Sequence, residues 1–305
     1  MDGYQAVLIA GPTASGKSQL ALDIARLTGG VIVNADSMQV YRDLRILTAR
    51  PSEADVEQAD HELYGFLPGD DAYSVGRYAE DVRDVLQRLE NGGRLPIIVG
   101  GTGLYFRALL SGLSPIPPVP DEIRAYWRAT AASCDAATLH GQLAARDPIM
   151  ADRLVPSDRQ RVVRALEVYE ATGRSLAYWQ SQPGTPVLDE ARTVRLVMDV
   201  PRHELYARCD RRLLAMVEQG VVDEVEALLA QGLDDELPLM RAVGVAAFAS
   251  HLAGGAAIDD AITRAQAETR NYVKRQLTWL RRNMITWKAV TLKYNDNELQ
   301  NSLRI

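Results

Sequence analysis

The residue pattern with the clearest chemistry lies near the amino terminus, where residues 11–18 read G-P-T-A-S-G-K-S. This is the G-x-x-x-x-G-K-[ST] pattern of a phosphate-binding loop. Backbone N–H groups of such a loop, at the positive end of a helix, bind phosphate oxygens. Its lysine adds a positive charge and its serine a hydroxyl for Mg²⁺. The pattern therefore predicts a diphosphate or triphosphate site. The predicted site comprises Gly11, Pro12, Thr13, Ala14, Ser15, Gly16, Lys17 and Ser18.

A second group with chemical potential is Asp36, which follows the short apolar run 31–33. A carboxylate just past a strand end lies where α/β sheets build their sites. Asp36 and Gln39 also have the spacing of a helix-capping box. The spacing leaves both interpretations open, and they are compatible.

A third strand is predicted over residues 95–99, and Gly100-Gly101-Thr102 follows it. P-loop ATPases usually end a neighbouring strand with an acid that orders Mg²⁺ and water. Here small residues and one hydroxyl occupy that place. This favours a loop that holds a phosphate leaving group over one that hydrolyses a phosphate.

The elements that would position these groups follow an α/β pattern. An apolar run at residues 6–10 and helical spacing of Leu20, Ile24 and Leu27 surround the loop, giving strand, loop and helix. A proline-rich stretch at residues 114–120 indicates a domain boundary. Helices are predicted after it, one starting at Ser157, and a strand over 194–200 then resumes the α/β pattern.

We therefore expect a parallel-sheet core flanked by helices, formed by residues 1–114 and 193–305. Residues 115–192 are expected to form an inserted all-helical domain. The carboxyl-terminal part of the core is expected to be helical, with a last helix over residues 262–287 and a polar tail after Lys293. Arg270, Lys274 and Arg281 share one face of that helix, flanked by Arg275 and Arg282. Such a face is either solvated or a nucleic-acid contact, and Trp279 and Trp287 nearby keep the second interpretation open.

Composition argues against a disulfide-bonded, zinc-binding or membrane-spanning protein. The chain has 305 residues, 47% hydrophobic content and a net charge of −6, as expected of a globular protein with a large core and about two domains. Two cysteines and four scattered histidines predict neither a disulfide nor a zinc site. Without an amino-terminal signal or an apolar run of membrane length, a cytoplasmic location is expected.

Six ordered segments together resemble the bacterial tRNA dimethylallyltransferase family. They are residues 11–18, the N-A-D-S-M-Q-V-Y-R stretch 34–42, the G-G-T-G-L-Y-F-R-A-L-L stretch 100–110, residues 164–173, residues 240–244 and the K-R-Q-L-T-W-L-R stretch 274–281. They span nearly the whole chain. The resemblance implies a P-loop NTPase-like core with an inserted helical domain, and mostly monomeric proteins.

The resemblance implies transfer of a dimethylallyl group from dimethylallyl diphosphate to N6 of adenosine 37, beside the tRNA anticodon, with release of diphosphate. The phosphate-binding loop would hold the diphosphate, with Lys17 and a Mg²⁺ ion on Ser18 stabilising the leaving group. Asp36 would accept the proton or hydrogen bond of the adenine amine. Thr102 would touch the target nucleotide or the diphosphate.

The resemblance also implies contacts to the tRNA anticodon stem-loop, including some from the helical domain. The matching residues are Asp36, Ser37, Met38, Gln39, Thr102, Arg124, Gln160, Arg161, Val162, Val163, Arg164, Arg241, Lys274, Arg275 and Arg281. Two departures stand out. Val245-Ala246-Ala247 replaces an aromatic and a basic residue common in the family, and Glu62 follows His61 where a second histidine is usual.

Three alternatives remain. A sibling family prenylates free adenine nucleotides with the same loop and acid. A P-loop kinase would use ATP and need no prenyl pocket. A non-catalytic P-loop switch would bind RNA without forming a product. Glycines after residue 99 and the Asp36 segment argue against the last two.

Overall fold

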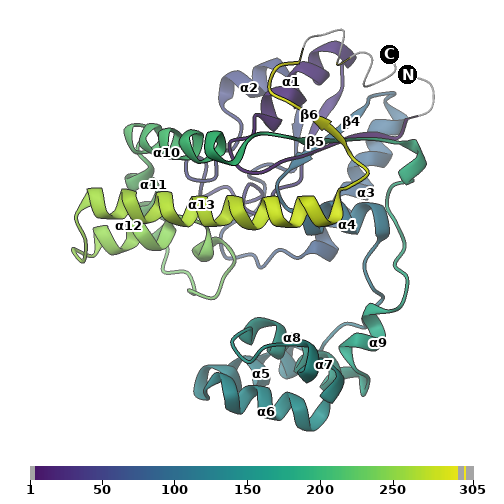
Figure 1. Ribbon diagram of the computed structural model, residues 1–305, viewed down its shortest axis with the longest axis vertical. Helices are drawn as coiled ribbons and strands as arrows, with labels where there is room; N and C mark the ends of the chain where they lie inside the picture. The colour runs from purple at the N-terminus through teal and green to yellow at the C-terminus, as the bar shows by residue number, and fades with distance from the viewer. Residues whose placement is uncertain (1–3, 295–298, 300–305) are drawn as a thin grey trace. The chain divides into compact units, whose positions relative to one another are not determined.

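The chain divides into two compact units in the computed structural model, which describes residues 4–294 and Leu299 (Figure 1). The core unit comprises residues 1–110 and 187–305, and the helical unit comprises residues 111–186. These boundaries differ by a few residues from 114/115 and 192/193. Residues 187–192 pack in the core unit: the Val187 N–H donates to the Leu109 carbonyl at 2.9 Å, and Leu188 is buried there. The expected tail after Lys293 lies outside the described residues, apart from Tyr294 and Leu299.

A parallel sheet of six strands forms the centre of the core unit within the described residues, in the order β3-β2-β4-β1-β5-β6. This confirms the predicted α/β class. The strands are β1 (Ala6–Ala10), β2 (Val31–Asn34), β3 (His61–Glu62), β4 (Pro96–Gly100), β5 (Thr193–Met198) and β6 (Lys288–Val290). Because parallel strands share their carboxyl edge, the segments that follow β1, β2 and β4 meet there.

Alternating side chains of β1 fill two hydrophobic clusters. Ala6, Leu8 and Ala10 pack on one face, where the buried residues of α3 (Val75–Asn91) and α4 (Gly103–Ser111) lie. Val7 and Ile9 pack on the other face against α1 (Lys17–Thr28). Burial on both faces explains why β1, β2 and β4 read as continuous apolar runs, which made them predictable.

Most of the remaining helices of the core unit pack around a third hydrophobic cluster, whereas the short helices at residues 53–58 and 190–192 bury no side chain. Figure 1 shows α13 running beside α10 and α12, and residues of all three pack together. The elements are α2 (Glu53–Gln58), η1 (Glu190–Arg192), α10 (Arg202–Glu218), α11 (Val221–Leu229), η2 (Leu239–Arg241), α12 (Val245–Leu252) and α13 (Ile258–Asn283).

The last helix corrects its predicted bounds. It begins four residues before Ile262, with Asp259 and Asp260 favourable in its first turn. It ends at Asn283, so Trp287 is not helical. The chain turns at Met284, whose carbonyl accepts the Trp287 N–H, and both side chains are buried against the sheet. The short strand β6, which the sequence analysis missed, follows directly.

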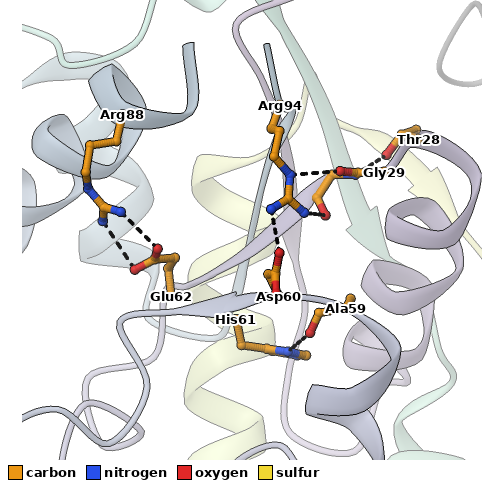
Figure 2. Close-up of polar contacts among 9 residues, drawn as sticks. Thr28, Gly29, Ala59, Asp60, His61, Glu62, Arg88 and Arg94 are labelled. Carbon is orange, nitrogen blue, oxygen red and sulfur yellow. Dashed lines mark hydrogen bonds and ion pairs between the residues drawn. The ribbon is translucent and has the colours of Figure 1, made fainter. Parts of the chain in front are cut away.

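Ion pairs hold the β3 edge of the sheet (Figure 2). The Arg88 guanidinium donates to both Glu62 carboxylate oxygens at 3.2 and 3.3 Å. Arg94 donates to the Gly29 carbonyl and pairs with Asp60. Glu62, one of the two departures from the family pattern, is therefore a partner of Arg88 at the surface. Such an exposed pair contributes little to stability.

The helical unit has a hydrophobic core of its own around Trp127, Leu139 and Leu166. Its helices are α5 (Asp121–Ser133), α6 (Ala136–Arg146), α7 (Pro148–Arg153), α8 (Arg159–Thr172) and α9 (Leu176–Gln180). Helix α8 is capped by Asp158, whose carboxylate accepts the Arg161 N–H, and not by Ser157 as predicted. Aspartate and serine cap equally well, so the sequence alone did not distinguish them.

Candidate active site

The phosphate-binding loop connects β1 to α1 with the predicted backbone. Gly16 has a φ of 84° and Ala14 a φ of 63°, the left-handed region that lets successive N–H groups turn inward. No side chain caps α1, and its first turn holds no acidic residue. The free N–H groups and the helix dipole therefore suit an anion, as the sequence predicts. The Ser15 hydroxyl is buried in the loop without a partner.

Lys17 lies partly buried at the start of α1, and its ammonium donates to the Pro12 carbonyl at 3.3 Å. Burial lowers the pKa of Lys17 to about 8, while the Asp36 carboxylate partly offsets this. The nearby Arg212 guanidinium lowers the Lys17 pKa further. The negative charge of Asp36 does not fully offset the two positive charges of Lys17 and Arg212. A bound anion would offset the remainder.

Arg212 on α10 is a site residue that the sequence analysis missed. Burial lowers the pKa of its guanidinium, and we see no ion pair or side-chain hydrogen bond of Arg212 among the residues that the structure describes. The buried Cys209 thiol and Asp36 act electrostatically on it. A half-buried arginine in such surroundings gains from a ligand that supplies a negative charge. No spacing signal links residue 212 to the loop, because the helix returns to it from another part of the chain.

Asp36 follows β2 in a tight turn and caps no helix, because residues 35–40 are not helical. Its N–H donates to the side-chain oxygen of Asn34 at 2.8 Å, and its Oδ1 accepts the Met38 N–H at 3.0 Å. Asn34 is fully buried and also donates to the Leu63 carbonyl. The carboxylate is thus fixed by one oxygen, and the other keeps its acceptor capacity for a substrate.

Thr102 joins the turn after β2 to the turn after β4. Its N–H donates to the Ala35 carbonyl at 3.2 Å, and its hydroxyl oxygen accepts the Ser37 N–H at 3.0 Å. A side chain at Gly100 would meet the Ala35 carbonyl oxygen at 2.0 Å, so only glycine permits this approach. The predicted catalytic residues Asp36 and Thr102 therefore belong to one assembly.

Gln276 on α13 connects the phosphate-binding loop to the β4 turn. Its side-chain oxygen accepts the Thr13 N–H at 2.9 Å, and its nitrogen donates to the Gly101 carbonyl at 3.2 Å. The side chain is 6% exposed. Residue 276 lies inside a segment that matches the family pattern, but no role was predicted for it. A glutamine in a helix carries no local signal of its partners.

Three tyrosines lie within electrostatic range of the Asp36 carboxylate, of which Tyr105 is buried and Tyr64 and Tyr272 are half-buried. Burial raises the pKa of Tyr64, Tyr105 and Tyr272, and the Asp36 charge raises each further. All three phenols are therefore protonated at neutral pH. Aromatic faces attract cations, so tyrosines near the carboxylate suit a site in which positive charge develops.

A groove of about 860 Å³ runs along α13 on the core unit. Arg241, Lys274 and Arg275, three of the predicted RNA contacts, line it together with Arg282 and Trp279. Arg281 is exposed but does not line it. Arg270 pairs with Asp210 at 2.7 Å, so it does not belong to a free basic face as predicted. Arg241 pairs with Glu236 at the surface.

The predicted RNA contacts of the helical unit lie on α5 and α8. Arg161 is exposed and pairs with Asp158 at 2.8 Å, and Gln160 is exposed. Arg124 pairs with Asp121 at 3.4 Å, and Arg164 pairs with the buried Glu167. Val163 is partly buried. Val162 is fully buried in the core of this unit, so its side chain has no surface to offer RNA.

The substituted segment 245–247 forms the first turn of α12. Val245 and Ala247 are buried in the third cluster, whereas Ala246 lines the groove. The short alanine side chain leaves the groove wider at this point than a large aromatic or basic side chain would.

Neither metal-binding clusters nor membrane spans were found in the part of the chain that the structure describes. No three His, Cys, Asp or Glu side chains there gather in a way that could hold a metal ion. A Mg²⁺ ion bound through substrate phosphates needs few protein ligands, and the exposed Ser18 at the start of α1 fits that requirement. None of the described helices has the length and apolar character of a membrane span.

Comparisons with known proteins show to which family the chain belongs. The sequence model of a family described as IPP transferase matches residues 39–283, and one described as Isopentenyl transferase matches residues 4–64. The tRNA dimethylallyltransferase of Methylocella silvestris is 53% identical over 281 residues, covering 92% of this chain and 93% of the relative. That of Azorhizobium caulinodans is 50% identical over 300 residues, covering 98% and 96%.

Solved structures agree with this result. The tRNA isopentenylpyrophosphate transferase of Bacillus halodurans matches with a TM-score of 0.69 and 29% identity, covering 98% of this chain and 94% of that one. A eukaryotic dimethylallyltransferase, described as acting on tRNA, matches with a TM-score of 0.80 and 26% identity, covering 97% and 75%. The chain therefore belongs to the IPP transferase family, and the curated relatives most similar to it are tRNA dimethylallyltransferases.

Proposed function

We propose that this protein transfers the dimethylallyl group of dimethylallyl diphosphate to N6 of adenosine 37, next to the anticodon of tRNA, and releases diphosphate. The observation that carries the proposal is the joining of an uncapped phosphate-binding loop and the Asp36 carboxylate at one sheet edge. No acid follows β4 there, so the site suits a leaving diphosphate better than hydrolysis of a nucleotide.

The donor half of the site would hold the diphosphate. The N–H groups of the loop and the cations Lys17 and Arg212 would stabilise the charge that grows on the leaving oxygen. Ser18 would hold a Mg²⁺ ion together with the phosphates, and the ion would supply further charge neutralisation. Because these groups are already in place, they need little reorganisation during the reaction.

The acceptor half of the site would orient the adenine amine. In the transfer, a bond forms between N6 and the allylic carbon while the carbon–oxygen bond breaks, and its electron pair leaves with diphosphate. The proton of N6 passes to Asp36, whose second oxygen keeps its acceptor capacity. An aromatic amine is a weak nucleophile, so holding it in line contributes as much as accepting its proton.

Three tyrosines near Asp36 complete the proposed site. Aromatic faces of Tyr64, Tyr105 and Tyr272 would stabilise positive charge on the allyl group and exclude water. Exclusion of water is required because hydrolysis of the donor competes with transfer.

The RNA half of the proposal uses surface residues of both units. Arg241, Lys274 and Arg275 in the groove would contact the anticodon arm, mainly through phosphates, as would Arg161 and Gln160 of the helical unit. The target base must leave its stack to reach a partly buried carboxylate.

The alternative acceptor is a free adenine nucleotide. The Isopentenyl transferase match covers only the phosphate-binding loop and the Asp36 segment, whereas the IPP transferase match continues through the helical unit and α13. A free nucleotide needs neither the basic groove nor a helical insertion. The extended match therefore favours tRNA.

The proposal is tested by incubating the protein with labelled dimethylallyl diphosphate, Mg²⁺ and unmodified tRNA, followed by digestion to nucleosides. We expect the label on N6 of a single adenosine beside the anticodon. The Lys17→Ala variant, which lacks the loop cation, is the control. Label on another base, or labelling that the variant retains in full, would contradict the proposal.

A further inference from the structure

The carboxylate of Glu224 on α11 binds three consecutive backbone N–H groups in a distant part of the chain. Its Oε1 accepts the N–H groups of Arg45 and Ile46 at 2.6 and 2.7 Å, and its Oε2 accepts that of Leu47 at 2.9 Å. Three N–H groups turned toward one point form an anion-binding nest. Here the protein fills the nest with its own side chain, which fixes the turn at residues 45–47.

The segment that follows this turn fixes the side chain of Gln39. The Gln39 amide nitrogen donates both of its hydrogens to the next two carbonyls, those of Thr48 at 2.8 Å and Ala49 at 3.0 Å. Ala49 has a φ of 53°, so the turn has a defined and unusual backbone. With its nitrogen used twice, the carboxamide has one permitted orientation.

The oxygen of the same amide is left available. The Gln39 Oε1 accepts no hydrogen bond from the described residues, and the side chain is only half-buried, so this oxygen is not sealed from solvent. Gln39 lies three residues after Asp36. It therefore presents a hydrogen-bond acceptor, and no donor, from the same segment that carries Asp36.

Glu224 has no other evident task. Glu224 forms no ion pair within the described part of the chain, and the Arg50 guanidinium acts on it only electrostatically. Asp36 and the phosphate-binding loop are held by different groups, namely Asn34, Thr102 and Gln276. Loss of Glu224 should therefore release Gln39 without disturbing the donor half of the site.

We propose that Glu224 is a positioning residue that fixes the Gln39 carboxamide with its oxygen toward the RNA, where it accepts a hydrogen bond from an exocyclic amine of a base. This inference rests on the proposed function. An acceptor at this place favours bases that present an amino group over bases that present a carbonyl. Glu224 does not itself touch the substrate.

The test measures steady-state KM for tRNA and for dimethylallyl diphosphate in Glu224→Ala and Glu224→Gln. In Glu224→Ala we expect KM for tRNA to rise about tenfold, the size of one well-placed hydrogen bond, with KM for the diphosphate unchanged. Glu224→Gln keeps one acceptor oxygen but turns a donor toward the Leu47 N–H, so its effect should be intermediate. Glu226→Ala and Glu226→Gln, exposed on the same helix, should match the wild type.

A double-mutant cycle separates positioning from general stability. If Glu224 acts through Gln39, substitution of Glu224 in a Gln39→Ala background should add no further rise in KM for tRNA. An undiminished rise in that background, or an unchanged KM in a folded Glu224→Ala protein, would overturn the inference. If Glu224→Ala does not fold, Glu224→Gln carries the same cycle. Wild-type protein that transfers no label to tRNA would instead overturn the proposed function.

Discussion

Lys17 keeps its positive charge in surroundings that oppose it. Burial and Arg212 lower its pKa to about 8, and only Asp36 and the Cys209 thiol act in the other direction. In the unfolded chain the pKa returns to an ordinary value near 10.5. The folded protein therefore binds the Lys17 proton more weakly than the unfolded chain does. A bound anion would offset this cost, so the site is prepared for an anionic ligand.

Replacing Lys17 by methionine should remove the charge and its cost together. The unfolded state binds the proton more tightly, so the penalty is complete below about pH 8 and disappears as the pH rises toward 10.5. We expect Lys17→Met to lose transfer activity yet to unfold at or above the wild-type temperature at pH 7. The difference between the two melting temperatures should shrink at pH 10. A variant less stable than the wild type at both pH values would contradict this account.

The same pKa sets the pH dependence of donor binding. A diphosphate favours protonated Lys17, so affinity for dimethylallyl diphosphate should be greatest below pH 8 and should fall as the pH rises above 8. Direct binding titrations between pH 7 and 9.5 measure this. Lys17→Arg, which stays charged throughout, should show a flatter profile. Equal slopes in the two proteins would assign the pH dependence to another group.

Asp36 is tested by its amide. Asp36→Asn keeps an acceptor oxygen for the Met38 N–H but loses basicity. If the carboxylate accepts the N6 proton, kcat should fall by about 100-fold or more, with KM for both substrates nearly unchanged. Rapid-quench measurement of the transfer step checks this. A kcat within a few-fold of the wild type would leave Asp36 as an orienting acceptor only.

At the scale of elements, α13 sets how the two halves of the site meet. Its inner face brings Gln276 to the loop and the β4 turn, and Trp279 packs so closely on Gly103 that a side chain there would meet its ring at 2.3 Å. Its outer face lines the groove with Lys274 and Arg275. One helix thus contacts the donor site and presents the expected RNA surface.

Gln276→Ala should therefore weaken donor binding. The Thr13 N–H and the Gly101 carbonyl would lose a partner in a largely buried place, at a cost of about 1–3 kcal/mol. We expect KM for dimethylallyl diphosphate to rise about tenfold or more, with a smaller change in KM for tRNA. Steady-state kinetics with each substrate varied provide the measurement. Gln266→Ala, on the same helix and hydrogen-bonded to Asp210, is the control and should bind the donor normally.

The elements show where sequence reasoning succeeded and where it did not. Long periodic helices and the buried strands β1, β2 and β4 were predicted because burial on defined faces is written into the sequence. The strands β3 and β6, of two and three residues, carry too little pattern to detect. The prediction of a basic face on the last helix was partly wrong. Arg270 pairs with Asp210 on a neighbouring helix, and such a pair cannot be read from the sequence of one helix. Arg212 and Gln276 were missed for the same reason.

At the scale of the whole molecule, the helical unit interrupts the core between two points that lie close together. The Leu109 carbonyl and the Val187 N–H are hydrogen-bonded at 2.9 Å. Within the helical unit, a Cβ added at Gly112 would meet the Gly184 carbonyl carbon at 2.6 Å, so these two backbone segments also pack against each other. Each unit has its own hydrophobic cluster. The proline-rich stretch indicated a domain boundary. The exact limits of the insertion depend on the tertiary packing of residues 187–192, which composition does not reveal.

Replacing residues 111–186 by a short glycine linker should leave a folded core. The linker has almost no distance to span, and the residues proposed to bind the donor and to accept the proton all lie in the core unit. We expect cooperative unfolding and near-normal binding of dimethylallyl diphosphate, but transfer to tRNA reduced about 100-fold or more. Circular dichroism melts and donor titration test the first part. Undiminished transfer to tRNA would show that the helical unit is not needed for RNA recognition.

The most direct test of the central claim, that the phosphate-binding loop serves prenyl transfer to tRNA, compares acceptors in one experiment. The protein is incubated with labelled dimethylallyl diphosphate and Mg²⁺, with unmodified tRNA or with AMP, and ATP consumption is followed in parallel. We predict label on tRNA, none on AMP, and no loss of ATP. Label on AMP alone would assign the protein to nucleotide prenylation, and ATP consumption without labelled product would contradict the account of the leaving group.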